Sequence, residues 1–240
     1  MYLSRVSVSL EHLDEFAKIF QYNHYQLHQL LWQLFTDSAA KKSRDFLFRR
    51  DESGHVPQFY VLSVIEPLPL KGVLAVQSKP FQPNLKKGDT LAFSLRANPV
   101  EQLKQTRTET EAEQHAQQRK DRGLTEKSTA KRVHHDVVMH FKKSLSDTER
   151  ENYSQAELEQ KAGERWLQAR SEKNGFRLLG VTVQGYQQHT FKKRQIKLST
   201  LDFEGILEVT DPDLFIQQAL YKGIGRSKAF GCGLLLIKRA

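Results

Sequence analysis

The sequence predicts an α+β protein made of two tandem ferredoxin-like (RRM-like) units, each with the element order β-α-β-β-α-β. The first observation is an order of strand, helix, two strands, weak helix and strand in the first part of the chain. The second is a similar series in the other half, and 240 residues suffice for two such units. We therefore expect an N-terminal unit over residues 1–99 and a C-terminal unit over residues 100–240.

In the N-terminal unit, loose alternation of apolar and polar residues predicts a strand at Tyr2–Leu10, followed by a helix that ends near Phe35. Two more strands are expected at Phe46–Arg50 and Phe59–Ile65, joined by a polar turn. A strand at Leu91–Leu95 closes the unit. Between these last two strands four prolines interrupt the chain, so a second helix there should be short or degraded; they are Pro67, Pro69, Pro80 and Pro83.

The segment that follows is polar. Ser94–His140 contains no Phe, Trp or Tyr, and Glu101–Arg132 is dense in Glu, Gln, Lys, Arg and Thr. Because such a composition can bury little apolar surface, we expect a mobile loop or a solvent-exposed helix here.

The C-terminal unit resumes with a strand around Val133–Phe141 and a helix that begins at Ser154, where Glu157 completes a capping box. Strands are expected at Phe176–Tyr186 and Gln195–Val209, joined by a basic turn. Asp211 should cap the last helix, with Pro212 at its first position. That helix ends at Gly223, and a closing strand follows at Gly233–Ile237.

Charge is distributed unevenly. The net charge is +9, and the stretch from Lys173 to the end holds eleven Lys and Arg against five Asp and Glu, which is +6 of that total. A basic half of this kind favours a polyanionic partner, although a merely basic protein is the alternative. The single cysteine, Cys232, cannot form an intramolecular disulfide, and no apolar run reaches the length of a membrane span. We expect a cytoplasmic protein with no membrane partner.

The most specific motif is the C-terminal run from Gly223 to Gly233, which holds four glycines and two cations in eleven residues. Glycine amides can approach a phosphate closely, so this loop is a candidate phosphate-binding site. The alternative is a turn that only reverses the chain. The candidate RNA-binding residues are Gly223, Gly225, Arg226, Ser227, Lys228 and Gly231.

A second motif lies in the predicted first helix. At about 100° per residue, Leu27, Leu30, Leu31 and Leu34 share one face, and His28 falls at its border with Tyr25 on the same side. Residues three apart are neighbours on a helix, so the imidazole and the phenol could act on one target. By itself this pattern is more typical of an ordinary surface-edge histidine than of a catalytic one.

A third motif is the basic turn between the two long strands, which could contact an RNA backbone or be a solvated hairpin tip. Its candidate RNA-binding residues are Lys192, Lys193, Arg194 and Lys197. His134, His135 and His140 lie near one another, but no Cys or carboxylate has metal-ligand spacing around them. We expect no metal site and no cofactor.

Several segments in their order resemble the CasE family of CRISPR-associated endoribonucleases, the precursor-crRNA-processing subunits of type I-E Cascade. They are MYLSRV at the start, YQLHQLLW at 25–32, RDFLFR at 44–49, LRANP at 95–99, FEG at 203–205 and GIGRSKAFGCGLL at 223–235. The resemblance implies a CRISPR repeat stem-loop as substrate, retention of the cleaved crRNA, and other Cascade subunits as partners. It also implies a catalytic histidine at His28 and a supporting tyrosine at Tyr25.

The reaction expected from this resemblance uses the nucleophile that RNA itself contains, the 2′-hydroxyl beside the scissile phosphate. Histidine is suited to moving the proton, whether as acid or as base, because both of its forms are accessible near neutral pH. The products would be a 2′,3′-cyclic phosphate and a 5′-hydroxyl, formed without a metal. The alternative is a non-catalytic scaffold that binds the RNA hairpin and leaves it intact.

Overall fold

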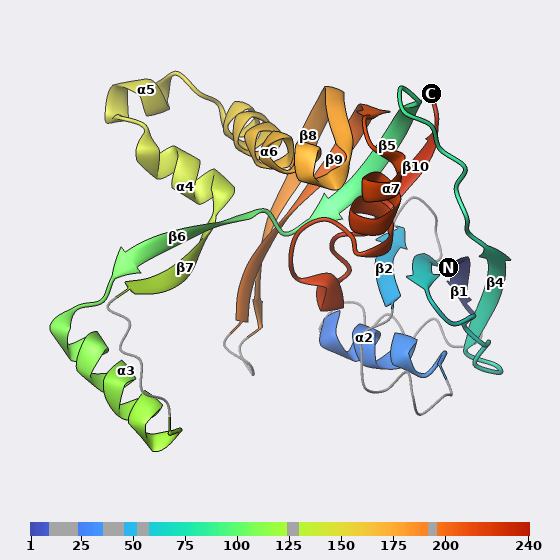
Figure 1. Ribbon diagram of the computed structural model, residues 1–240, viewed down its shortest axis with the longest axis horizontal. Helices are drawn as coiled ribbons and strands as arrows, with labels where there is room; N and C mark the ends of the chain where they lie inside the picture. Colours follow the sequence, from blue (N-terminus) through green and yellow to red (C-terminus); the bar gives the residue numbers. More distant parts are fainter. Residues whose placement is uncertain (10–23, 36–45, 52–57, 124–129, 192–195) are drawn as a thin grey trace.

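The computed structural model describes residues 1–9, 24–35, 46–51, 58–123, 130–191 and 196–240, and for residues 24–26 the backbone alone. Two four-stranded antiparallel sheets form its frame (Figure 1). The first sheet contains β1 (Tyr2–Val8), β2 (Phe46–Asp51), β3 (Gln58–Ser63) and β4 (Leu74–Pro80). The second contains β5 (Thr90–Ala97), β8 (Phe176–Phe191), β9 (Ile196–Val209) and β10 (Leu235–Arg239).

The two sheets repeat one topology. Their strand orders are β2-β3-β1-β4 and β10-β5-β9-β8. When the strands of each sheet are numbered along the chain, both orders read 4-1-3-2, which shows that one unit occurs twice. The prediction of an α+β fold with two tandem ferredoxin-like units is confirmed.

The division of the chain at residue 99 stays a prediction. The strand expected at Leu91–Leu95 does not close the N-terminal unit: β5 pairs with β9 and β10 in the second sheet, and β4 is the fourth strand of the first. The sheets also contact each other. Arg49 of β2 donates to the Ser94 hydroxyl of β5 at 2.8 Å, and Leu47 packs with Leu234 in a small buried cluster.

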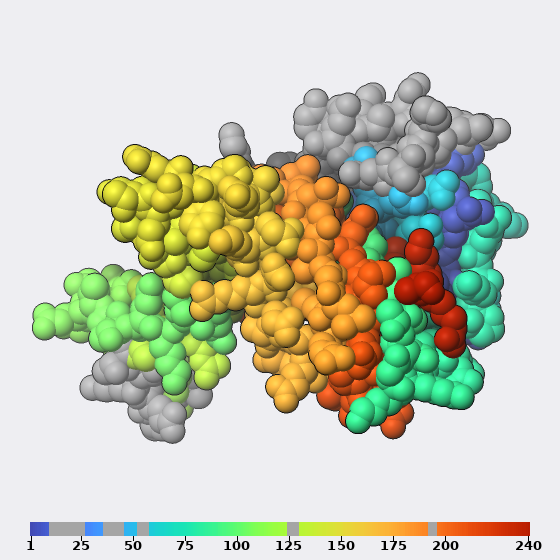
Figure 2. Space-filling view, turned by 90° about the horizontal axis from the view of Figure 1, so that it is seen from above, coloured from blue at the N-terminus to red at the C-terminus, as the bar shows by residue number. Residues whose placement is uncertain are grey.

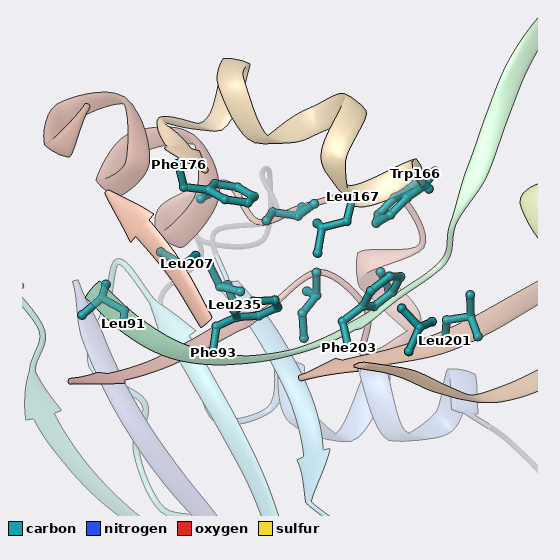
Figure 3. Close-up of a cluster of buried hydrophobic side chains, with 14 of the residues drawn as sticks. Leu91, Phe93, Trp166, Leu167, Phe176, Leu201, Phe203, Leu207 and Leu235 are labelled. Carbon is teal, nitrogen blue, oxygen red and sulfur yellow. The ribbon is translucent and has the colours of Figure 1, made fainter. Parts of the chain in front are cut away.

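The main core lies between the second sheet and α6 (Gln155–Ser171), where Trp166 and Leu167 pack on Phe203 and Leu207 (Figure 3). The Trp166 and Phe203 ring centroids are 5.6 Å apart. The predicted capping box of α6 is confirmed, since Ser154 and Glu157 bond each other's backbone amides. The last helical turn, α7 (Pro212–Leu214), is capped by Asp211 and continues as the wider helix η4 (Phe215–Tyr221).

The core of the first unit is formed by α2 (His24–Trp32), the turn after it and the first sheet. Leu27, Leu31 and Leu34 are buried against Phe46 and Phe59, as the helical spacing of the leucines predicts. Between β3 and β4 the described chain holds turns and no helix, because Pro67 and Pro69 interrupt it before β4 begins.

A long insertion follows β5 and projects from the body (Figures 1 and 2). Its strands β6 (Val100–Thr106) and β7 (Ala130–Asp136) form a two-stranded ribbon. At the outer end of the ribbon lies α3 (Glu109–Asp121), a capped helix that buries no residue (Figure 1). The predicted exposed helix is thus present, although its flanks pair as strands. Two short helices follow, α4 (Val137–Ser144) and α5 (Asp147–Glu151).

The predicted strand Val133–Phe141 is correct to residue 136 and wrong beyond it. The Asp136 carboxylate accepts a hydrogen bond from the Met139 amide at 2.8 Å and so begins α4. Among the described helices none is long and apolar enough to cross a membrane.

Candidate active site and nucleic-acid interface

His28 lies on α2 within a cluster of aromatic rings. Its ring centroid is 5.8 Å from that of Phe46, with an interplanar angle of 24°, and 6.2 Å from that of Phe48. The side chain is 8% exposed, so His28 is buried where the helical pattern places it at a border. The difference arises because β2 brings two phenylalanines against this side of the helix.

Trp32, one turn further along α2, donates its indole N–H to Nε2 of His28 at 3.1 Å. An indole can only donate, so Nε2 is the acceptor of this hydrogen bond, which assigns the ring hydrogen to Nδ1. An imidazole in this form can take a proton from a hydroxyl group. Tyr25 lies three residues earlier on the same helix, and its side chain is outside the described residues.

The glycine-rich run forms the loop that joins η4 to β10, with a short 3₁₀ turn, η5 (Lys228–Phe230), inside it. Gly223 has φ +73°, and a Cβ there would lie 2.6 Å from the Gly233 carbonyl oxygen and 2.7 Å from Leu47. Gly231 has φ +80°, and its Cβ would lie 3.2 Å from the Phe48 ring. These glycines therefore let the loop turn and pack on β2. Phosphate binding by Gly223, Gly225 and Gly231 stays a prediction.

Ser227 holds the middle of this loop in a strained conformation. It is the one non-glycine residue with positive φ (57°) in the part of the chain that the structure describes. Its hydroxyl donates to Oδ1 of Asn98 at 3.0 Å, and Nδ2 of Asn98 donates to the Ser199 carbonyl at 2.6 Å. A left-handed residue costs about 1–2 kcal/mol. These bonds offset that cost and fasten the loop to β9.

The two cations of the loop point in different directions. Arg226 is exposed, and its guanidinium donates to Nε2 of His134 on β7 at 2.6 Å. Lys228 is turned back, with its ammonium donating to the carbonyl of Lys222. Arg226 is therefore at an exposed surface, whereas Lys228 is half-buried.

That surface is a groove of about 710 Å³ between the β8–β9 hairpin and the start of the insertion. Lys197 of β9, Lys143 of α4, and Arg226 and Ser227 of the glycine-rich loop line it. Sequence reasoning did not single out Lys143. The predicted contacts at Lys192, Lys193 and Arg194 lie outside the described residues.

A smaller cavity of about 180 Å³ separates α2 from the hairpin. Leu27, the neighbour of His28, lines it on one side, and Phe230 and Gly231 of the glycine-rich loop line it on another. His28 itself packs against Phe46 and Phe48 and does not line this cavity. The predicted site residues thus fall into two neighbouring places, the α2 cluster and the groove.

His189 of β8 connects these two places, because it lines both the cavity and the groove. Its Nε2 is 3.1 Å from the Thr200 hydroxyl. Burial, and secondarily the charge of Arg96, lower the pKa of His189. Arg96 also lines the cavity and is fixed by two 2.8 Å hydrogen bonds to Asp202. Sequence reasoning missed both residues, since only the pairing of β8 and β5 with β9 brings them here.

Among the described residues, no three His, Cys, Asp or Glu side chains gather into a group that could hold a metal ion.

Known proteins are similar to this chain in fold and in sequence. The family described as CRISPR associated protein matches residues 1–239. The chain is 29% identical over 246 residues to the CRISPR system Cascade subunit CasE of Escherichia coli (strain K12), with 98% of each chain covered. It is 26% identical to the CRISPR-associated endoribonuclease Cse3 of Thermus thermophilus, with 90% of each covered.

A solved structure of the CRISPR endoribonuclease Cse3 bound to 19 nt RNA is also similar. It has a TM-score of 0.63 and 27% identity, and the match covers 99% of this chain and 98% of that one. The two sheets share the same strand order, and the family model matches residues 1–239. The chain therefore belongs to the CRISPR associated protein family.

Proposed function

We propose that this chain is an endoribonuclease that cuts CRISPR repeat stem-loops in precursor crRNA without a metal. It then stays bound to the crRNA within a Cascade complex. Family membership supports this proposal, as do two relatives, one named as a Cascade subunit and one as an endoribonuclease. The similarity to an endoribonuclease solved with RNA adds to that support.

The observation that carries the proposal is the meeting of α2 and the glycine-rich loop at one cavity. Leu27, next to His28, faces Phe230 and Gly231 across it. The helix thus brings the imidazole of His28 near this cavity, and the loop brings the exposed cation Arg226. Metal-free RNA cleavage needs groups that move protons and a positive charge that stabilises the phosphate, and these residues are candidates for both roles.

In the proposed reaction the 2′-oxygen bonds to phosphorus while the bond from phosphorus to the 5′-oxygen breaks. The 2′-hydroxyl proton leaves, and the departing 5′-oxygen receives a proton, which yields a 2′,3′-cyclic phosphate and a 5′-hydroxyl. His28 moves one of these protons, and Tyr25 orients the scissile nucleotide. Arg226 stabilises the charge that grows on the phosphate. The nucleophile belongs to the RNA, so the protein need not supply a metal-bound water.

The cations that line the groove support retention of the cleaved crRNA. Lys197, Lys143 and Arg226 lie on it, and each cation set against a phosphate releases counterions and strengthens binding. Several such contacts slow the release of RNA, which suits a subunit that keeps its crRNA beside other Cascade subunits. We propose a cytoplasmic location for the same reason, since the precursor RNA is found there.

The second candidate function is a scaffold that binds the RNA hairpin without cutting it. The observation that favours it is the burial of His28, whose Nε2 already accepts the Trp32 indole N–H. Cleavage through Nε2 requires the RNA to replace that hydrogen bond. Catalytic hydrogen bonds are often completed only in the complex with substrate, so the enzyme remains the better-supported proposal.

The test mixes the purified protein with repeat RNA in EDTA and resolves the cleavage products with their end groups. We expect a single cut that leaves a cyclic phosphate in the wild type and none with His28→Ala. Because His28 is packed among aromatic rings, His28→Gln should be tested beside it, with the thermal midpoint of each variant measured. His115→Ala, on the exposed helix α3, is the matched control. Binding without cutting by the wild type would establish the scaffold instead.

A further inference from the structure

The β6–β7 ribbon has one exposed face that the proposed function leaves without a role. Its antiparallel register sets Lys104 opposite Arg132 and Gln102 opposite His134. Both pairs are exposed, as is the pair of Thr106 and Ala130 beyond them. Alternate residues of a strand point to opposite faces, so these six side chains share one side of the ribbon. We call it the cationic face.

Lys104 and Arg132 form an unfavourable pair. Like charges directly opposite each other destabilise an antiparallel pair of strands, and a two-stranded ribbon is only marginally stable. Neither side chain forms an ion pair within the described part of the chain. The other face is different, since Lys131 there pairs with Glu111 and Glu101 lies 3.2 Å from His140.

One carboxylate, Asp136, lies on the same side as the cationic face, at its base. It is occupied by other bonds, since it caps α4 and accepts the Tyr186 hydroxyl at 3.1 Å. Burial raises the pKa of Tyr186 to about 12, so the phenol stays protonated and remains a donor near neutral pH. The positive charge of Lys104 and Arg132 is therefore not neutralised from within this face.

The cationic face continues into the groove. His134 follows Arg132 on the same side of β7 and accepts the Arg226 guanidinium at 2.6 Å. Residues two apart on a strand lie about 6.6 Å apart, so Arg132 and His134 are close neighbours on this face. Arg132 thus has His134 as its neighbour on this face, and His134 lines the groove together with the cations Arg226 and Lys197. Figure 1 shows the ribbon reaching away from the body beside the β8–β9 hairpin.

We propose that the cationic face of the β6–β7 ribbon is a second RNA-binding element, in which Lys104 and Arg132 contact the phosphates of the strand that leaves the groove. This inference rests on the proposed function, because it needs an RNA in the groove. A protein partner fits less well. The cationic face carries no large apolar side chain, whereas the centres of protein interfaces are apolar and poor in charge.

The test measures RNA affinity over a range of salt concentrations for the wild type and for the double variant Lys104→Gln/Arg132→Gln. The RNAs are the repeat stem-loop alone and the stem-loop with single-stranded flanks, each with a 2′-deoxy nucleotide at the cut position so that it is not cleaved. Lys131→Gln is the matched control, because it removes one charge from the opposite face of the same ribbon. The double variant should keep the wild-type thermal midpoint, since it removes a repulsive pair.

The slope of log K against log salt is negative, and each lost phosphate contact should reduce its magnitude by about 0.7. At 0.1 M salt this corresponds to a loss of about 5-fold in affinity. For the double variant, which loses the contacts of Lys104 and Arg132, we expect a slope smaller in magnitude by about 1.4 and binding about 25-fold weaker. Lys131→Gln should match the wild type. A loss seen only with the flanked RNA assigns the contact to the flank, and a loss seen with both RNAs assigns it to the stem.

The inference is overturned if the double variant keeps the wild-type slope, or if Lys131→Gln weakens binding as much per charge. It is also overturned if the double variant binds RNA normally but no longer assembles with Cascade subunits, since the face would then contact protein. Failure of the proposed function looks different, because the wild type itself would neither bind nor cut the repeat.

Discussion

Replacing Asn98 by Ala should loosen the glycine-rich loop from the second sheet. Asn98 is 4% exposed and joins two segments, donating to the Ser199 carbonyl at 2.6 Å and accepting the Ser227 hydroxyl at 3.0 Å. A net contribution of about 0.5–1.5 kcal/mol for each bond gives a loss of about 1–3 kcal/mol in the free energy of unfolding. The upper part of that range is expected, because the variant leaves buried partners without their hydrogen bonds.

The assay is urea unfolding followed by circular dichroism, together with a double-mutant cycle that uses Ser227→Ala. Since the two side chains bond each other, their changes should not add, and the coupling energy should be at least about 0.5 kcal/mol. Asn98→Asp is the useful intermediate, because it keeps the acceptor for Ser227 and removes the donor to Ser199. The m value should stay constant, so that the change reports stability alone.

The reasoning about this anchor would be refuted by a loss below about 0.5 kcal/mol for Asn98→Ala, which is within the range of an ordinary surface change. Strict additivity of the two substitutions would refute it as well. Either result would mean that the loop is held by its glycines and their packing, and that the Asn98 bridge contributes little.

Three other predictions concern stability. Gly223→Ala should lower the free energy of unfolding by more than the roughly 1–2 kcal/mol that a left-handed residue costs, because the new Cβ would overlap neighbouring backbone. Gly88 has φ +90° and open space around it, so Gly88→Ala should show the left-handed cost alone in the same urea assay. The pKa of Tyr186 is raised to about 12, so its contribution to stability is present below about pH 10 and is lost as the pH rises toward 12; Tyr186→Phe should flatten that alkaline part of the thermal-midpoint profile. Burial lowers the pKa of His189, so its contribution is present above about pH 6.5 and is lost as the pH falls; a His189→Asn profile as steep between pH 7 and 5 as the wild type would contradict this assignment.

Features that depend on local chemistry could be predicted from the sequence. The capping box at Ser154 fixes the start of α6 through hydrogen bonds to neighbouring residues, so it could be identified without the fold. The helical spacing of Leu27, Leu31 and Leu34 identified the buried face of α2 for the same reason. The order of strands and helices predicted the repeated unit, and the quoted motifs predicted the family, which the match over residues 1–239 confirms.

Other features depend on contacts between distant segments, and they became visible only in the folded chain. His28 is buried because β2, which follows it in the chain, packs Phe46 and Phe48 against its ring. The polar composition of the insertion gave no sign of β6, because the β6–β7 ribbon is held by backbone hydrogen bonds and buries little apolar surface.

The residues of the candidate site also divide into those that the local sequence identifies and those that only the folded chain brings together. Single motifs identified Arg226 and Lys197 as candidates, because a cation in a glycine-rich run or a hairpin stands out locally. His189, Arg96 and Lys143 carry no such local mark. They come from three separate elements, β8, β5 and α4, and strand pairing and helix packing alone bring them to the walls of one cavity and one groove.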